Sequence, residues 1–300
     1  MKVAIAGGSG FVGSQLTNIL TKAGHEVLIL TRSDKQGGGE ITYVQWMKDG
    51  SLPEKHLDGI DAIVNLAGKN INDRWTDETK KQIIESRVEA TNEVYRILNA
   101  LEKKPSVLVN ASAVGIYGTS SKATFIEEDT GSGNDFLAKT AKIWENEAKK
   151  VGELGIRLIF ARFGVLLGKN AGALPKMMLP YKLFLGGNFG SGEQWISWIH
   201  AEDAAKMILF AIENKKINGP MNVTAPNPVQ NKTFGKTLAK AMNRRHWLPA
   251  PAFALKAAIG EMSMLVLDGQ RAIPKKALEQ KYAFSYPTLD EALTNIIKSS

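Results

Sequence analysis

The chain begins with a strand that runs directly into a glycine-rich turn. Residues 2–6 form a short apolar run, and glycines follow at once in the spacing Gly-x-x-Gly-x-x-Gly, ahead of an apolar helical pattern. In such a strand–turn–helix unit, backbone N–H groups and the helix dipole bind a pyrophosphate. A tight turn that needs glycine for steric reasons alone is the alternative, but the position at the start of a βα unit favours a dinucleotide site. We expect the cofactor to contact Gly7, Ser9, Gly10, Phe11, Val12 and Gly13.

Strand and helix patterns alternate up to about residue 165. We expect strands at 3–6, 26–31, 43–46, 61–66, 106–112 and 157–162, and helices at 10–23, 77–102 and 135–154. This alternation predicts an α/β fold with a Rossmann-like, doubly wound parallel sheet. Glycine- and proline-rich loops with short helices follow. We therefore expect a nucleotide-binding Rossmann domain at 1–165, to which residues 198–225 return, and a smaller C-terminal substrate lobe made of 166–197 and 226–300.

Composition excludes several classes of site and partner. The 300 residues include no cysteine, which rules out disulfides and thiolate chemistry, and the four histidines show no metal-ligand spacing. No apolar run is long enough to span a membrane, and the first strand is too short for a signal peptide. The net charge of +8 comes from scattered lysine pairs rather than a basic stripe. We expect a cytoplasmic monomer or homodimer that binds no metal, nucleic acid or membrane.

The end of the second strand indicates which dinucleotide is bound. An acidic residue there binds the ribose 2′-hydroxyl of NAD, whereas a basic residue binds the 2′-phosphate of NADP. Here the strand ends with Thr31, Arg32 and Ser33. The Arg32 guanidinium matches a phosphate in a bidentate geometry, and Ser33 adds a hydroxyl donor. Asp34 would favour NAD, but it lies further into the loop, so we expect NADP or NADPH.

Two further segments are expected near the cofactor. Leu66, Ala67 and Gly68 form a small-residue turn after the fourth strand, where the backbone approaches the cofactor or simply turns tightly. In the next helix, Arg87 falls within an apolar stripe (Ile84, Val88, Thr91, Tyr95 and Leu98). A charge on an inward face needs a partner. Arg87 therefore either pairs with a structural carboxylate or, as we favour, reaches the cofactor, and Gln82 lies close enough along the helix to join it.

The spacing of the first turn resembles that of the short-chain dehydrogenase/reductase superfamily, in particular its extended branch. Other segments resemble the "epimerase family protein" subgroup of atypical members, which are related to the NAD-dependent epimerases and dehydratases and have their own C-terminal domain. These segments are residues 73–76, 85–88, 195–200, 219–226 and 269–274. The resemblance covers nearly the whole chain. It implies a Rossmann domain, NADP binding through Thr31, Arg32, Leu66, Ala67 and Arg87, and an oxidoreductase or epimerase activity.

The resemblance also points to candidate catalytic residues. Ser112 and Tyr117 stand where the superfamily delivers a catalytic serine and a Tyr-Gly pair, and Phe163 lies in a segment that normally passes the nicotinamide. Ser112 would also contact the cofactor. His200 and Asp203 match a His-x-x-Asp segment, for which we favour a helix cap and a packing contact over catalysis.

The usual catalytic pair of the superfamily is missing. Its members place Tyr-x-x-x-Lys on the helix after the serine strand, where the lysine lowers the pKa of the tyrosine. Here Phe136 aligns with Thr140, and Leu137 with Ala141, so no register supplies both residues. Helical periodicity also directs Lys139 and Lys142 toward solvent.

Two functions are compatible with these observations. The first is an NADP-dependent oxidoreductase or epimerase that acts on a carbonyl or hydroxyl substrate, such as a nucleotide sugar. Ser112 would orient the substrate, Tyr117 or water would carry the proton, and Trp195 and Trp198 would stack on a ring or belong to the core. The second is an NADPH-binding sensor or scaffold that has lost the chemistry.

Overall fold

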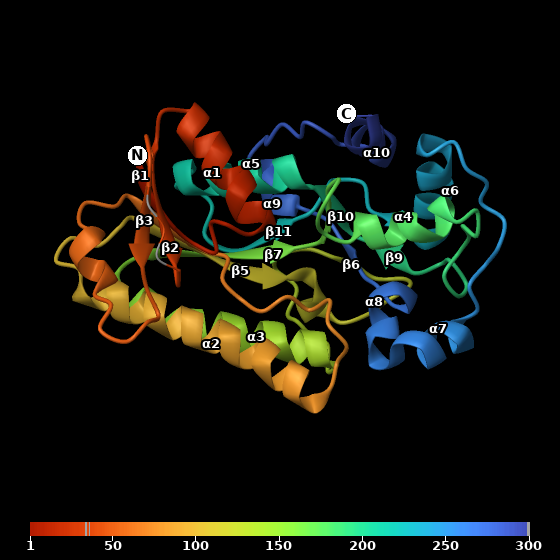
Figure 1. The fold of residues 1–300 in the computed structure, drawn as a ribbon, viewed down its shortest axis with the longest axis horizontal. Coiled ribbons are helices and arrows are strands. Elements are labelled where there is room, and N and C mark those ends of the chain that lie inside the picture. Colours follow the sequence, from red (N-terminus) through yellow and green to blue (C-terminus); the bar gives the residue numbers. More distant parts are fainter. Residues whose placement is uncertain (34, 36, 299–300) are drawn as a thin grey trace.

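The computed structural model describes residues 1–33, 35 and 37–298. Asp34, the residue that would favour NAD, lies outside the described residues. Figure 1 shows a central sheet covered by helices, with a second group of short elements at the end of the molecule that carries α7. Within the described residues, no helix is long and apolar enough to cross a membrane.

A seven-stranded sheet forms the centre of the molecule, in the order β11-β7-β5-β4-β1-β2-β3. Every neighbouring pair is parallel. Its strands are almost continuously buried because helices cover both faces. The predicted doubly wound parallel sheet is thus confirmed. The strands are β1 (Lys2–Ala6), β2 (Glu26–Thr31), β3 (Ile41–Gln45), β4 (Ala62–Asn65), β5 (Val107–Ala113), β7 (Arg157–Phe163) and β11 (Gly219–Val223).

Two helices cover each face of the sheet (Figure 1). On one face, α1 (Phe11–Lys22) and α5 (Ala201–Glu213) pack on Val3 and Ile5 of the first strand. Residues between these two turn to the opposite face, where α2 (Asp77–Ala100) and α3 (Phe136–Lys149) lie side by side. The expected helix at 135–154 is shorter than predicted, because its last five residues form the 3-10 turn η3 (Lys150–Leu154) around Gly152.

Most of the remaining elements build the smaller lobe. Helices α6 and α10 pack together there over a separate apolar core, while β11 returns the chain to the edge of the main sheet. Strand β13 pairs with β6, which follows the serine strand. These elements are β6 (Thr124–Phe125), β8 (Val165–Leu167), α4 (Leu174–Lys182), β9 (Trp195–Ile196), β10 (Trp198–His200), β12 (Val229–Gln230), α6 (Asn231–Ala241), α7 (Ala252–Ile259), α8 (Met264–Leu267), β13 (Arg271–Ala272), α9 (Lys275–Glu279) and α10 (Leu289–Lys298), with 3-10 turns η1 (Pro53–His56), η2 (Val114–Tyr117) and η4 (Gly260–Ser263).

Candidate functional site

The glycine turn between β1 and α1 has the geometry of an anion site. Gly7 adopts a φ of +78°, and the N–H of Gly10 donates to its carbonyl at 2.9 Å. A Cβ added at Gly13 would lie 2.2 Å from that carbonyl oxygen, so only glycine lets α1 begin so close to the turn. No side chain caps the start of α1. Its first N–H groups have no acceptor within the helix, which fits the turn to a pyrophosphate.

Arg32 follows directly after the last residue of β2 and is exposed. Within the described part of the chain, no hydrogen bond or ion pair engages its guanidinium. The neighbouring Thr31 hydroxyl accepts a hydrogen bond from the N–H of Ser33 at 3.2 Å, which folds the backbone back at the strand end. Arg32 is therefore free to bind an anion at this edge of the sheet.

The structure brings Leu66, Ala67 and Gly68 against the glycine turn. A Cβ at Gly7 would lie 2.9 Å from the carbonyl carbon of Leu66, and one at Gly68 would lie 3.2 Å from Cγ of Arg87. The N–H of Ala67 donates to the side chain of Asn65 at 3.2 Å, which fixes the turn. Three segments distant in sequence thus meet beside the candidate phosphate site.

Arg87 lies on the inward side of α2, although the stripe around it differs from the predicted one. Its guanidinium donates to the carbonyls of Lys69 and Ile83 at 3.0 and 2.8 Å, and stands 4.8 Å from the ring centre of Trp144. Burial lowers the pKa of Arg87 to about 10. No carboxylate among the described residues accepts from it, so the predicted structural ion pair is absent there. The buried stripe is Ile83, Ala90, Thr91, Val94, Ile97 and Leu98.

Other predicted cofactor residues have local partners. Gln82 donates to Glu78 of the same helix at 2.6 Å. Phe11 packs on the loop before α4, where a Cβ at Gly168 would lie 2.3 Å from its ring. Val12 is buried in the core beneath α1, and Phe163 closes β7 beside Ala113.

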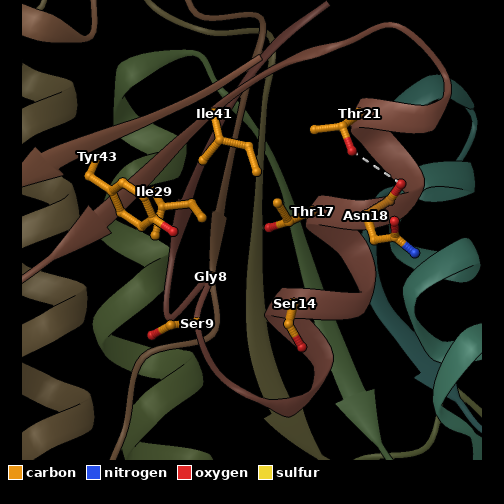
Figure 2. Close-up of a pocket in the computed structure, with 9 residues that line it drawn as sticks. All are labelled: Gly8, Ser9, Ser14, Thr17, Asn18, Thr21, Ile29, Ile41 and Tyr43. Atoms are coloured by element: carbon orange, nitrogen blue, oxygen red, sulfur yellow. Dashed lines mark hydrogen bonds between the residues drawn. The ribbon is translucent and has the colours of Figure 1, made fainter. Parts of the chain in front are cut away.

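An open pocket of about 280 Å³ lies along α1 and shares Gly8 and Ser9 with the glycine turn. Figure 2 shows Ser14, Thr17 and Thr21 on the helix wall, facing apolar side chains of β2 and β3. Arg32, Leu66 and Arg87 do not line it. The pocket is therefore separate from the path that the predicted cofactor residues mark.

Ser112 stands near the end of β5, beside Arg162 of β7 in the sheet register. Its hydroxyl donates to Glu145 Oε1 at 2.7 Å. The same carboxylate forms a two-pronged ion pair with Arg162, at 2.8 and 3.0 Å. All three side chains are buried, and the pair satisfies both charges. Ser112 therefore has its hydrogen committed to the protein, while its oxygen lone pairs can still accept.

Tyr117 lies inside the same polar cluster and is only 1% exposed. Its hydroxyl donates to Asn222 Oδ1 at 2.8 Å and accepts from Arg162 at 2.9 Å. The ring stacks on Phe125 at 5.1 Å between ring centres. Burial, partly offset by the adjacent guanidinium, raises the pKa of Tyr117 to about 12. At neutral pH the phenol is protonated and held by two partners.

The α3 positions that would hold the usual tyrosine and lysine carry apolar residues. Leu137 lies against Gly115, where an added Cβ would be 3.5 Å from the leucine Cβ, and Ala141 is buried. Lys139 faces solvent as predicted. The prediction for Lys142 was wrong: it is half-buried and donates to the carbonyl of Gly133 at 2.7 Å, because the preceding loop folds back over this turn of the helix.

Two buried polar residues of this cluster were missed by sequence reasoning. Glu145 follows Ala141 by four residues and precedes Ala148 by three, so helical spacing alone could have placed it inward. Asn222 on β11 had no such signal, because its partners come from distant strands. The predicted structural role of His200 and Asp203 is confirmed: His200 caps α5, and Asp203 accepts from two backbone N–H groups of the 285–286 loop.

Arg271 was not singled out from the sequence and lies where the smaller lobe meets the loop after η2. Its guanidinium stands 4.6 Å from the ring centre of Trp195, whose indole N–H donates to the carbonyl of Ser121. The Nε atom is buried and has no hydrogen-bond partner among the described residues. No carboxylate in this part of the structure pairs with Arg271. A positive charge without a partner at this position can bind an anion.

Comparison with known proteins gave matches over the whole chain. The model of the "NAD dependent epimerase/dehydratase family" matches residues 3–224, and a domain of unknown function (DUF1731) matches residues 250–296. The chain is 52% identical to Epimerase family protein YfhF of Bacillus subtilis over 298 residues, which is 99% of this chain and 98% of that protein.

Solved structures are also similar. The human epimerase family protein SDR39U1 (isoform 2) with NADPH has a TM-score of 0.89 and 33% identity, with both chains covered completely. A nucleoside-diphosphate sugar epimerase of Corynebacterium glutamicum has a TM-score of 0.79 and 31% identity, over 99% of this chain and 58% of that one.

Proposed function

Because the chain belongs to the NAD dependent epimerase/dehydratase family, whose members bind NAD or NADP, we propose that it is an NADP(H)-dependent oxidoreductase or epimerase. Its substrate would carry a carbonyl or hydroxyl group together with a negative charge. The observation that carries this proposal is the glycine turn at the start of α1, which only glycine can form and which leaves helical N–H groups free for a pyrophosphate.

The choice of NADP over NAD depends on Arg32. An arginine with no protein partner at the end of β2 suits a 2′-phosphate, because it gains a bidentate ion pair only when that phosphate is present. Arg87 would face the cofactor from α2, since carbonyl oxygens and an indole ring leave its charge uncompensated. NADPH bound to the 33% identical human protein is consistent with this choice.

When bound, the nicotinamide would supply or accept the hydride. In this protein Ser112 would orient the substrate, because its oxygen can accept a hydrogen bond from a substrate hydroxyl while its own hydrogen stays on Glu145. Water would carry the proton, since the hydroxyl of Tyr117 is held by two partners and its pKa is raised to about 12. Arg271, stacked on Trp195, would bind the charged part of the substrate, as a nucleotide sugar would require.

A second function is supported by the same cluster. Ser112 and Tyr117 both spend their hydroxyl hydrogens on protein acceptors, and α3 presents leucine and alanine where a proton-transfer pair usually stands. General acid–base catalysis contributes about 10²–10⁴ in rate, so its loss leaves cofactor affinity intact. A protein of this kind would sense or sequester NADPH without consuming it.

Cofactor titration tests the first part of the proposal. We expect NADPH to bind more tightly than NADH, and Arg32→Ala to remove most of the difference. Arg245→Ala, which changes another exposed arginine in the smaller lobe, is the matched control and should bind both cofactors as the unchanged protein does. A tighter Kd for NADH, or no effect of Arg32→Ala, contradicts the NADP assignment.

A substrate panel separates the enzyme from the sensor. The purified protein is incubated with NADPH and a set of carbonyl compounds and nucleotide sugars, and loss of NADPH absorbance and product formation are followed. Turnover that falls in Ser112→Ala and in Arg271→Gln establishes the enzyme. Tight NADPH binding without turnover of any compound supports the sensor.

A further inference from the structure

The smaller lobe carries most of the large exposed apolar side chains of the molecule. Phe253, Phe184 and Trp247 are 76%, 65% and 61% exposed. We name this set the distal apolar surface; it comprises Leu179, Leu183, Phe184, Leu185, Trp247, Leu248, Phe253 and Ile259. It lies on α4, on the segment before α7 and on α7 itself, at the end of the molecule opposite β3 (Figure 1).

Hydrogen bonds join the two segments that form this surface. The N–H groups of Trp247 and Leu248 both donate to the carbonyl of Gly186, at 2.9 and 3.1 Å. The indole of Trp247 donates to the carbonyl of Phe184 at 3.0 Å. Phe184 itself has a φ of +61°, a left-handed conformation that a phenylalanine rarely adopts. The backbone is thus held in a strained shape that displays an aromatic ring to solvent.

Helix α7 completes the surface. It is almost entirely apolar, and none of its residues is buried. A helix whose apolar residues find no core normally meets another surface, because contiguous exposed apolar patches are uncommon on monomeric proteins.

The charges around the distal apolar surface have a single sign. Residues 174–192 and 243–260 contain no aspartate or glutamate, and their basic residues are Lys176, Lys182, Arg244, Arg245 and Lys256. Arg244 stands 4.7 Å from the ring centre of Phe184, so charge and apolar area are intermixed. The first acidic residues beyond these segments, Glu193 and Glu261, already pair with lysines.

We propose that this surface docks the protein on a membrane leaflet rich in anionic lipid. Aromatic and leucine side chains beside lysines and arginines are the combination that inserts into a headgroup region and attracts its negative charge. A second copy of the chain suits this surface less well, since a two-fold contact would bring the same arginines face to face. The sequence-based expectation of no membrane partner rested on the lack of a spanning segment, which an interfacial contact does not require.

Sedimentation of the full chain with lipid vesicles tests the proposal. We expect binding to vesicles of phosphatidylglycerol and phosphatidylcholine that is weakened by salt, and little binding to phosphatidylcholine alone. Phe253→Asp should weaken binding about tenfold or more, because it removes a buried aromatic ring. Arg245→Ala should weaken it about fivefold, the effect of one basic residue near the surface.

The matched control is Leu278→Asp, which changes an exposed leucine of α9 away from the surface and should bind vesicles normally. Thermal unfolding of each variant checks that it is folded, and Leu183→Asp replaces Phe253→Asp if that variant fails to fold. No binding to anionic vesicles, equal binding to both kinds of vesicle, or a dimer that Phe253→Asp dissociates and that does not bind vesicles would each overturn the proposal.

Discussion

Replacing Gly13 by alanine tests the nucleotide site most directly. The added methyl carbon would lie 2.2 Å from the carbonyl oxygen of Gly7 and 2.7 Å from Cα of Gly8. Both neighbours are backbone atoms, so no side chain can rotate away. The start of α1 and the turn must therefore separate by about 1 Å to restore ordinary contact.

That displacement sets the expected size of the effect. Crowding of this kind costs about 1–3 kcal/mol of folding free energy. A lost hydrogen bond to a charged group costs about 1.5–3 kcal/mol, so loss of one backbone contact to the pyrophosphate weakens NADPH binding by about 10- to 150-fold. The assay is NADPH titration by fluorescence, with urea unfolding measured on the same samples.

The matched control is Gly152→Ala in the 3-10 turn after α3. An added Cβ there meets nothing within 4 Å, and the backbone does not adopt a positive φ. We expect this variant to bind NADPH normally and to gain up to about 1 kcal/mol of stability. If Gly13→Ala is folded and binds NADPH within twofold of the unchanged protein, the turn does not hold the pyrophosphate and the reasoning fails.

Three further predictions concern the buried charges. Burial raises the pKa of Glu127, so the stability this group contributes below its ordinary pKa is lost as pH rises through the raised one; the stability of Glu127→Gln relative to the unchanged protein should therefore increase from pH 4 to neutrality in urea unfolding, and a decrease would refute this. Arg162→Met strands the buried carboxylate of Glu145 and should cost about 3–5 kcal/mol, whereas Lys150→Ala, which breaks an exposed pair, should cost less than about 1 kcal/mol by the same measurement. Arg157 donates to four backbone carbonyls at the end of α5 and beyond it, so Arg157→Ala should lower the free energy of unfolding by about 1.5–3 kcal/mol; a change below 0.5 kcal/mol would show that water replaces it.

The sequence by itself determined the local features of the nucleotide site. The turn of Gly7, Gly10 and Gly13 is made by residues that are neighbours in the chain, and hydrophobic periodicity is set by the same local geometry, so the strands of the sheet and its flanking helices could be predicted. The place of Arg32 at the end of β2 follows from the same pattern. Boundaries were less exact: α3 ends five residues early because Gly152 lies in a 3-10 turn.

Only the tertiary structure decided what the polar residues contact. The cluster that holds Ser112 and Tyr117 joins β5, η2, α3, β7 and β11, whose partners lie up to 105 residues apart in the chain. No periodicity encodes such a pairing, since it depends on which strands become neighbours and on the register between them. Lys142 and Arg87 show the same limit, because loops from elsewhere supply their acceptors. The exposure of α7 is the counterpart: its apolar sequence resembles that of a core helix, and only the packing of the lobe leaves it facing outward.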